Sequence, residues 1–199
     1  MYTSGKGRRI VLKGIDISKW NKNVDYKSPD FIIIKASEGV NYKDPLLDFH
    51  YNNLNSIKKE DKLYGFYHYA RPELGNSGEE EAKSFLSYVG HHAGKCLYVL
   101  DWEGNALKYP IEWAIEFLDY VYAHTGVKPL IYCSASVTKT LQKVYEKDYG
   151  LWVAHYGVST PSIRVYPFWA MWQYTSSPID CNYFNGNRNT FKKYCEVNK

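Results

Sequence analysis

A series of short apolar runs, spaced along almost the whole chain, constrains the fold more than any other feature of this sequence. The runs are GIDIS from Gly14, FIIIKAS from Phe31, LYGFYHYA from Leu63, CLYVLDWE from Cys96, PLIYCS from Pro129, GLWVAHY from Gly150 and WAMWQYT from Trp169, with a further candidate, IDCNYF, from Ile179. Runs of β-branched and aromatic residues without strict alternation are typical of parallel strands buried on both faces. The sequence therefore predicts up to eight strands in a mainly parallel sheet.

Helical patterns fill several of the gaps between these runs. Ser77 precedes an apolar helical repeat and is followed three residues later by a glutamate, which is the pattern of a capping box. A second helical repeat starts at Pro110 and closes near Gly126. Helices are also expected over residues 45–60 and 136–147. This alternation of strands and helices indicates an α/β fold.

The last third of the chain departs from the alternation. Residues 156–168 and 175–178 are rich in Ser, Pro and Thr and carry no helical period, so the last strands are expected to join without full helices. Eight strands with helices mainly in the first part fit an irregular, TIM-like barrel, and an open doubly wound sheet is the alternative. The 199 residues, 45% of them hydrophobic, suffice for one core. We expect a single domain.

The net charge of +4 comes from one short segment. Four basic residues in a stretch without acids account for the whole excess: Lys6, Arg8, Arg9 and Lys13. We therefore expect a flexible basic leader over residues 1–13 and a nearly neutral folded body, the barrel, over residues 14–199. A neutral body argues against nucleic-acid binding through a basic face.

Neither a membrane span nor a secretory signal is recognisable in the sequence. No segment approaches the roughly 18 consecutive apolar residues that a membrane helix needs, and the first residues, MYTSGKGRRIVLKG, lack an apolar stretch. We expect no membrane insertion and no signal peptide. The four cysteines have no CxxC or CxxxC spacing, so we expect no metal site. Because no export signal is recognisable, we expect the cysteines to be free thiols, and we expect no cofactor.

Two acids lie one residue apart where a buried strand ends. In LYVLDWEGN, Asp101 and Glu103 close an apolar run. Residues i and i+2 of a strand point to the same side, with backbones about 6.5 to 7 Å apart. Because sites in parallel α/β folds assemble at the carboxyl ends of the strands, both carboxylates are expected to face one cavity. An unpartnered buried carboxylate costs several kcal/mol, so such a pair favours a chemical role.

Other strand ends carry matching polar groups. They are Asp16, Lys35, Glu38, Tyr67, His68 and Asp180. Several acids around one mouth indicate acid/base chemistry or a cation site, whereas any one of them alone is equally well explained as a helix cap or an ion-pair partner. Two acids in one polar cavity repel, which raises one pKa and places a proton donor beside an ionised group. Such a pair is the standard equipment for cleaving a glycosidic bond.

Aromatic residues gather near the same strand ends. They are Tyr67, Tyr69, Tyr132, Trp152, Tyr156, Trp169, Trp172 and Tyr174. Aromatic faces stack on sugar rings, and the same side chains are also ordinary core residues. Those at the very ends of strands are therefore candidates for contact with a glycan.

The ordered series of motifs resembles the glycoside hydrolase family 25 lysozymes, muramidases of bacteria and phages that include the Chalaropsis-type enzyme. The resemblance runs from Gly14 to Phe184 through GIDISKWN, FIIIKASEG, GFYHYARP, LDWE, IYCS, LWVAHY, WQYTSS and IDCNYF. It implies a (β/α)5(β)3 barrel that hydrolyses the β-1,4 bond between N-acetylmuramic acid and N-acetylglucosamine in peptidoglycan. The glycan strands are then the partner, and we expect a monomer.

The resemblance also implies roles for particular residues. Glu103 matches the family's catalytic acid/base, and Asp101 and Asp180 match acids that support it and the developing positive charge. Asp16 matches the acid at the end of the first strand. The implied nucleophile is the substrate's own acetamido group, which gives retention, although the spacing of the acid pair alone leaves inversion open. The expected contacts to the glycan are Lys35, Glu38, Tyr67, His68, Tyr132, Trp152, Tyr156 and Gln173.

Three features depart from the family pattern. Asn21 stands where a glutamine is frequent, Trp102 separates the two acids, and SSPIDCN is shorter than the usual loop before the last aspartate. The short loop trims the rim of the expected groove, which leaves open how further sugars or the peptide stems are bound.

Two other interpretations remain open. A chitinase-like barrel also ends a strand in acids, but here no further acids stand two and five residues upstream of Asp101. A non-catalytic glycan-binding module would keep the aromatic groove without the acid pair. The sequence carries no recognisable export signal or wall-binding repeat, so we expect a phage endolysin, made in the host cytoplasm and released to the wall by a holin or by lysis. The alternatives are a bacterial autolysin and a tail-associated lysin.

Overall fold

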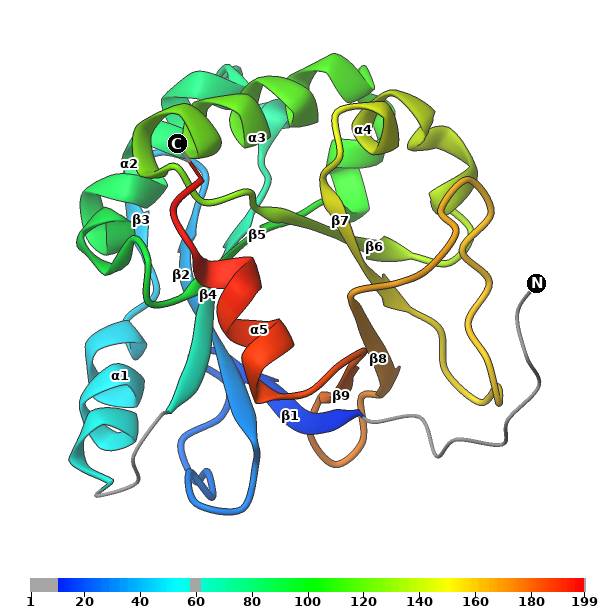
Figure 1. Ribbon diagram of the computed structural model, residues 1–199. Coiled ribbons are helices and arrows are strands. Elements are labelled where there is room, and N and C mark those ends of the chain that lie inside the picture. The colour runs from blue at the N-terminus through cyan, green and yellow to red at the C-terminus, as the bar shows by residue number, and fades with distance from the viewer. Residues whose placement is uncertain (1–10, 58–61, 199) are drawn as a thin grey trace.

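Eight strands close into a barrel in the computed structural model, which describes residues 11–57 and 62–198. Figure 1 shows how the strands and helices are arranged. The barrel strands are β1 (Leu12–Ile17), β2 (Phe31–Glu38), β4 (Leu63–Tyr69), β5 (Leu97–Asp101), β6 (Leu130–Ser134), β7 (Gly150–Ala154), β8 (Met171–Thr175) and β9 (Cys181–Phe184). The short β3 (Tyr42–Lys43) pairs with the end of β2. All seven predicted runs and the eighth candidate form strands.

Closure comes from β1, which pairs with β2 on one side and with β9 on the other. Around the barrel the strands follow the order β1-β2-β4-β5-β6-β7-β8-β9. Neighbours from β1 through β8 are parallel, whereas β9 is antiparallel to both of its neighbours. The barrel expectation is confirmed, and the open doubly wound alternative is wrong because the first strand completes the ring.

Four α-helices lie in connections between parallel strands, and a fifth follows β9. They are α1 (Leu47–Ser56), α2 (Gly78–Val89), α3 (Ile111–Thr125), α4 (Gln142–Glu146) and α5 (Arg188–Cys195), with 3-10 turns at Pro72–Leu74, Gly90–His92, Gly104–Lys108 and Thr138–Thr140. The connections β1–β2 and β7–β8, both within the described part of the chain, contain no helix. The helices therefore do not form a strict run of five βα units. No helix in the described ranges is long and apolar enough to span a bilayer.

Helix ends follow the signals in the sequence. Ser77 Oγ accepts a hydrogen bond from the Glu80 N–H at 3.1 Å, and the Glu80 carboxylate accepts one from the Ser77 N–H at 2.8 Å, so the predicted capping box is present. Helix α3 begins directly after Pro110 and ends at Gly126, whose φ of 70° is left-handed. The two other predicted helices are present as α1 and the shorter α4.

Side chains alternate between the barrel interior and the layer beneath the helices. Interior residues such as Ile33 and Val99 are fully buried. The rings of Phe31, Phe184 and Phe191 pack at the end where the parallel strands begin, with centroids 4.9 to 6.4 Å apart. Because Phe191 belongs to α5, this helix closes one end of the barrel. The inward-facing polar side chains Asp16, Asp101 and Gln173 lie at the other end.

The folded body begins earlier than the charge pattern predicts. Strand β1 starts at Leu12, inside the predicted leader. Leu12 is 8% exposed, packs into the barrel interior and pairs with Phe184. The predicted boundary after residue 13 is therefore too late. The prediction follows the basic residues, whereas the fold begins where the apolar side chain of Leu12 is buried. Residues 1–10, which hold the rest of the predicted leader, lie outside the described residues.

His68 is fully buried on the outer side of the barrel wall. Its Nδ1 lies 2.9 Å from Ser37 Oγ, and its Nε2 lies 2.8 Å from the Glu81 carboxylate. Its ring stacks on Phe117 with 4.9 Å between centroids. Adjacent residues of a strand face opposite sides, so Tyr67 faces the interior while His68 faces the helices. The prediction that His68 contacts the glycan is therefore wrong.

Replacing Glu81 with alanine should lower the free energy of unfolding by about 3 kcal/mol. Glu81 is fully buried and also accepts a hydrogen bond from the Arg71 N–H at 3.0 Å. Its removal leaves the Nε2 atom of His68 and this N–H without their hydrogen-bond partner. Chemical denaturation followed by circular dichroism measures the loss. Glu79, exposed on the same helix, is the matched control, and Glu79→Ala should cost under about 1 kcal/mol. Equal losses of unfolding free energy in the two variants would contradict a structural role for the buried Glu81 side chain.

Candidate active site

The open end of the barrel holds a cavity of about 230 Å³. Its lining residues come from strands far apart in the sequence: Asp16, Tyr67, Asp101, Glu103, Tyr132, Trp152, Tyr156, Gln173 and Asp180. Asp16 lies near the end of β1, Asp101 ends β5, and Asp180 directly precedes β9. The four acids that the sequence places at strand ends thus share one cavity.

Asp101 and Glu103 face the cavity because side chains alternate as the chain leaves β5. Trp102 points the other way and stacks on Trp113 of α3, with 5.7 Å between ring centroids. The Trp102 N–H donates to the Tyr132 carbonyl at 2.9 Å and so extends the pairing of β5 with β6. The tryptophan between the acids is part of the core that fixes their direction.

Asp101 is 7% exposed, and its Oδ1 has no hydrogen-bond partner in the described part of the chain. Burial raises the pKa of Asp101 well above its ordinary value, and the charge of Glu103 adds to the shift, while Lys35 opposes it. A buried carboxyl oxygen without a partner is poised to form a hydrogen bond with a bound ligand.

Glu103 is also shifted toward its protonated form. Burial raises the pKa of Glu103, the charge of Asp180 adds to the shift, and Lys35 opposes it. Burial likewise raises the pKa of Asp180. Carboxyls that share one desolvated cavity resist simultaneous ionisation. The cavity therefore keeps a proton at pH values where free carboxylic acids have lost theirs, as a general acid requires.

Asp16 is held by two amides. Its Oδ2 accepts hydrogen bonds from Asn182 Nδ2 at 2.7 Å and from Gln173 Nε2 at 2.9 Å. Burial, followed by the charge of Asp180, raises the pKa of Asp16 to about 7, although both amides favour the ionised form. Because both donors bind Oδ2, a proton on this carboxyl resides on Oδ1.

Asn182 is a site residue that the sequence does not reveal as one. It is fully buried, and its Oδ1 accepts a hydrogen bond from Trp152 Nε1 at 2.8 Å while its amide nitrogen binds Asp16. It lies two residues after Asp180 and shares its side of the chain. Its i, i+2 spacing from Asp180, the same spacing that relates Asp101 to Glu103, is the signal that could have identified it.

Gln173 connects two cavity tyrosines to Asp16. Its Oε1 accepts hydrogen bonds from the hydroxyls of Tyr132, at 2.9 Å, and Tyr156, and its amide nitrogen donates to Asp16. Burial raises the pKa of Tyr132 far above its ordinary value, so the hydroxyl stays a donor. The tyrosines thereby fix the direction in which the amide points. The rings of Tyr132 and Trp152 meet edge to face at 4.8 Å and form an aromatic wall.

Lys35 and Glu38 are not among the residues that line the cavity. Lys35 Nζ forms an ion pair with Glu38 at 2.8 Å and lies 4.9 Å from the centroid of the Tyr69 ring. A register shift in β2 between Lys35 and Ser37 redirects the end of this strand. Lys35 acts on the cavity through its charge, which opposes the rise in the pKa of Glu103. Direct contact of these two side chains with a glycan stays a prediction.

The cavity combines aromatic walls with proton-holding acids. Five of the predicted glycan contacts line it: Tyr67, Tyr132, Trp152, Tyr156 and Gln173. Within residues 11–57 and 62–198, no group of three or more His, Cys, Asp or Glu side chains is arranged to hold a metal ion. An aromatic wall suits the apolar face of a sugar ring, and a protonated carboxyl beside other acids suits proton transfer to a glycosidic oxygen.

Comparison with known sequences decides the family. The sequence model of glycosyl hydrolases family 25 matches residues 15–182, a span that contains all four cavity acids. The chain belongs to glycosyl hydrolase family 25. It is similar to Lysozyme M1 of Streptomyces globisporus, with 32% identity over 214 residues that cover 93% of this chain and 71% of that protein. The resemblance carried by the motifs is confirmed, and family membership makes the chain a lysozyme-type glycoside hydrolase.

Solved structures agree with the family and the fold. The bacterial lysozyme from Streptomyces coelicolor has a TM-score of 0.80 and 30% identity, covering 92% of this chain and 96% of that one. The catalytic domain of endolysin ply40 from bacteriophage P40 of Listeria monocytogenes has a TM-score of 0.71 and 28% identity, covering 94% of this chain and 99% of that one. The barrel described above is therefore shared with a structurally characterised lysozyme and with the catalytic domain of an endolysin.

Asp16→Asn should make the stability of the protein less dependent on pH. The pKa of Asp16 is about 7 in the fold against an ordinary value of 3.8, so between these values the native state holds a proton that the unfolded chain has released. The free energy of unfolding should therefore fall as pH rises through this window, by on the order of 1–4 kcal/mol from this group. Asparagine keeps the acceptor for both amides but carries no charge.

Urea unfolding at several pH values between about 4 and 8 measures this slope. Asp148→Asn is the control, because its side chain is 89% exposed and its left-handed φ of 61° suits asparagine. This control should keep the wild-type slope. Identical slopes for wild type and Asp16→Asn would contradict a proton held on Asp16.

Proposed function

We propose that this protein is an N-acetylmuramidase, which hydrolyses the β-1,4 bond between N-acetylmuramic acid and N-acetylglucosamine of peptidoglycan. The observation that carries the proposal is the grouping of four carboxyls with aromatic walls in one cavity at the open end of the barrel. Similarity to Lysozyme M1 supports this class of substrate.

Glu103 is the proton donor in the proposed mechanism. Burial and the charge of Asp180 raise its pKa, which favours the protonated form needed at the start. Its carboxyl is not used to cap the 3-10 turn that follows, so it is available to substrate. Glu103 delivers its proton to the glycosidic oxygen as the bond from that oxygen to C1 of N-acetylmuramic acid breaks.

The acetamido group of the substrate is the proposed nucleophile. Its carbonyl oxygen attacks C1 and forms an oxazolinium intermediate. The Asp101 Oδ1 atom, which has no protein partner, accepts a hydrogen bond from the acetamido N–H. Asp180 stabilises the positive charge that develops on the sugar ring. Glu103 then removes a proton from the water that opens the intermediate. Two inversions at C1 give net retention.

We further propose that the protein acts in wall lysis as a phage endolysin, made in the host cytoplasm and reaching the wall once a holin opens the membrane. Similarity to the catalytic domain of endolysin ply40 supports this role. Expression in a bacterial host with and without a holin tests it, because an endolysin lyses the cells only when the holin is present. Lysis without a holin would instead favour an exported autolysin.

Glu103→Gln should lower the release of glycan fragments by at least about 10²- to 10⁴-fold, because glutamine cannot transfer a proton. Mass spectrometry of soluble fragments from purified peptidoglycan measures this and identifies the new reducing ends. Wild type should release fragments that end in reducing N-acetylmuramic acid.

Glu112→Gln is the matched control, since Glu112 is an exposed glutamate on α3, and it should retain wild-type turnover. Near wild-type turnover in Glu103→Gln would refute its assignment as the acid. Reducing N-acetylglucosamine ends would identify a glucosaminidase, and binding to walls without fragments from wild type would identify a non-catalytic module.

The first product should carry the β configuration at its new reducing end. Proton NMR of a soluble glycan, recorded early in digestion and before mutarotation, distinguishes the two anomers. Initial formation of the α anomer would indicate direct attack by water and exclude acetamido participation.

A further inference from the structure

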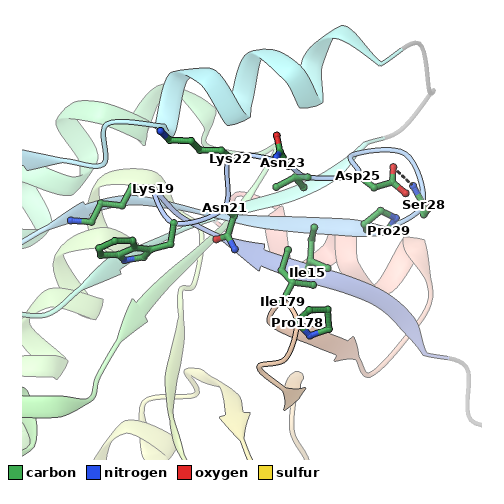
Figure 2. A pocket seen from close by; sticks show the side chains of 12 residues that line it. Ile15, Lys19, Asn21, Lys22, Asn23, Asp25, Ser28, Pro29, Pro178 and Ile179 are labelled. Atoms are coloured by element: carbon green, nitrogen blue, oxygen red, sulfur yellow. Dashed lines mark hydrogen bonds between the residues drawn. The ribbon is translucent and has the colours of Figure 1, made fainter.

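A second, larger hollow lies on the outer face of the barrel, beside the mouth of the acid cavity. It is a groove of about 790 Å³ between the β1–β2 connection and the turn that leads into β9 (Figure 2). Its floor is apolar, from Ile15, Val24, Pro29, Pro178 and Ile179. Its rim is polar and charged.

The groove exists because one neighbouring connection has no helix and the other is a short turn. The β1–β2 connection is an irregular loop where the neighbouring βα units place a helix, so the outer face of β1 is only partly covered. The turn between β8 and β9 is short and contributes only Pro178 and Ile179 to the groove. The short loop SSPIDCN therefore leaves the outer face of β1 partly exposed.

The groove and the acid cavity lie on opposite faces of the same wall. Ile15 lines the groove and Asp16 lines the cavity, and the pair Ile179 and Asp180 repeats this arrangement. Consecutive Cα atoms are about 3.8 Å apart, so only one thickness of backbone separates the two spaces. A branch on a sugar in the cavity has to cross only this rim to enter the groove.

One end of the groove carries positive charge and an exposed aromatic ring. Trp20 is 82% exposed. The Lys19 ammonium lies 5.0 Å from the centroid of the Trp20 ring and donates a hydrogen bond to the Tyr42 hydroxyl at 3.0 Å. Lys22, also exposed, lines the same end. This end is suited to a carboxylate attached to an apolar body.

The other end carries a fixed negative charge. Asp25 Oδ1 accepts hydrogen bonds from the N–H groups of Lys27 at 2.8 Å and Ser28 at 3.3 Å. The hydrogen bond from the Ser28 side chain and those from the backbone lower the pKa of Asp25, which keeps it ionised. A ligand that spans the groove therefore meets cations at one end and an anion at the other (Figure 2).

We propose that this groove binds the peptide stem of the substrate, a short acidic peptide that is attached to the sugar in the cavity. The inference rests on the muramidase activity proposed above. Stem peptides carry free carboxylates and commonly a diamino residue, which match the lysines and Asp25 respectively. An extended peptide spans about 3.5 Å per residue, so four residues reach about 14 Å from the sugar across the rim and along the floor.

The test compares two substrates for each variant: glycan strands that carry their stems, and the same strands from which an amidase has removed the stems. The readout is the ratio of kcat/KM on the two substrates. Wild type should prefer the stem-bearing strands by about fivefold or more, and Lys22→Glu should bring the ratio close to one because it reverses a charge at the groove. Trp20→Ala should lower the ratio as well. Lys83→Glu makes the same charge change at an exposed site on α2, outside the groove, and should keep the wild-type ratio.

Each other result overturns a specific claim. A wild-type ratio near one refutes stem binding. An equal loss on both substrates in Lys22→Glu assigns the groove to the glycan and also refutes it. If Lys83→Glu changes the ratio as much as Lys22→Glu does, the effect comes from the overall charge of the protein, and stem binding in the groove is refuted. If wild type cleaves neither substrate, the muramidase assignment itself fails, which the other results cannot mimic.

Discussion

The pairing of β1 with both β2 and β9 is the constraint on which the rest of this structure depends. In a closed sheet every side chain faces either the interior or the outer layer. The interior is filled by aromatic packing against α5 at one end, so inward-facing polar groups gather at the other end. The same alternation that sends Asp16 inward sends Ile15 outward, and thus one strand builds both the acid cavity and the groove behind it.

The cavity acids are held together against their own repulsion. Burial and mutual charge favour protonation, while the amides of Gln173 and Asn182 favour the ionised form of Asp16. Those amides cannot turn away, because Trp152 and Tyr132 donate to their oxygens. A barrel end filled with apolar side chains would be more stable than this one. The difference is the stability that a catalytic site characteristically gives up.

The sequence predicts the strands and the acids well but not the directions of all side chains. Asp101 and Glu103 are predictable because an acid pair at spacing two, after an apolar run, has one face to share. Strands that are apolar on both faces give no alternation from which to read inside and outside. For that reason the sequence groups His68 with Tyr67, although one is sealed against α2 and the other lines the cavity. Asn182 is not predicted as a site residue, because an amide in a short terminal strand does not by itself indicate a chemical role.

The absence of a helix after β1 bears on recognition as well as on packing. Leaving an apolar wall partly open to water costs about 25 cal/mol for each Å² exposed, and a regular barrel avoids that cost by covering the strand with a helix. Here the uncovered wall adjoins the mouth of the acid cavity and is bordered by charges of opposite sign at its two ends. A bound partner that covers this apolar wall recovers the free energy that its exposure costs. On the proposal that the groove binds the peptide stem, the irregular connection is part of the substrate-binding surface and not an incomplete version of a regular barrel.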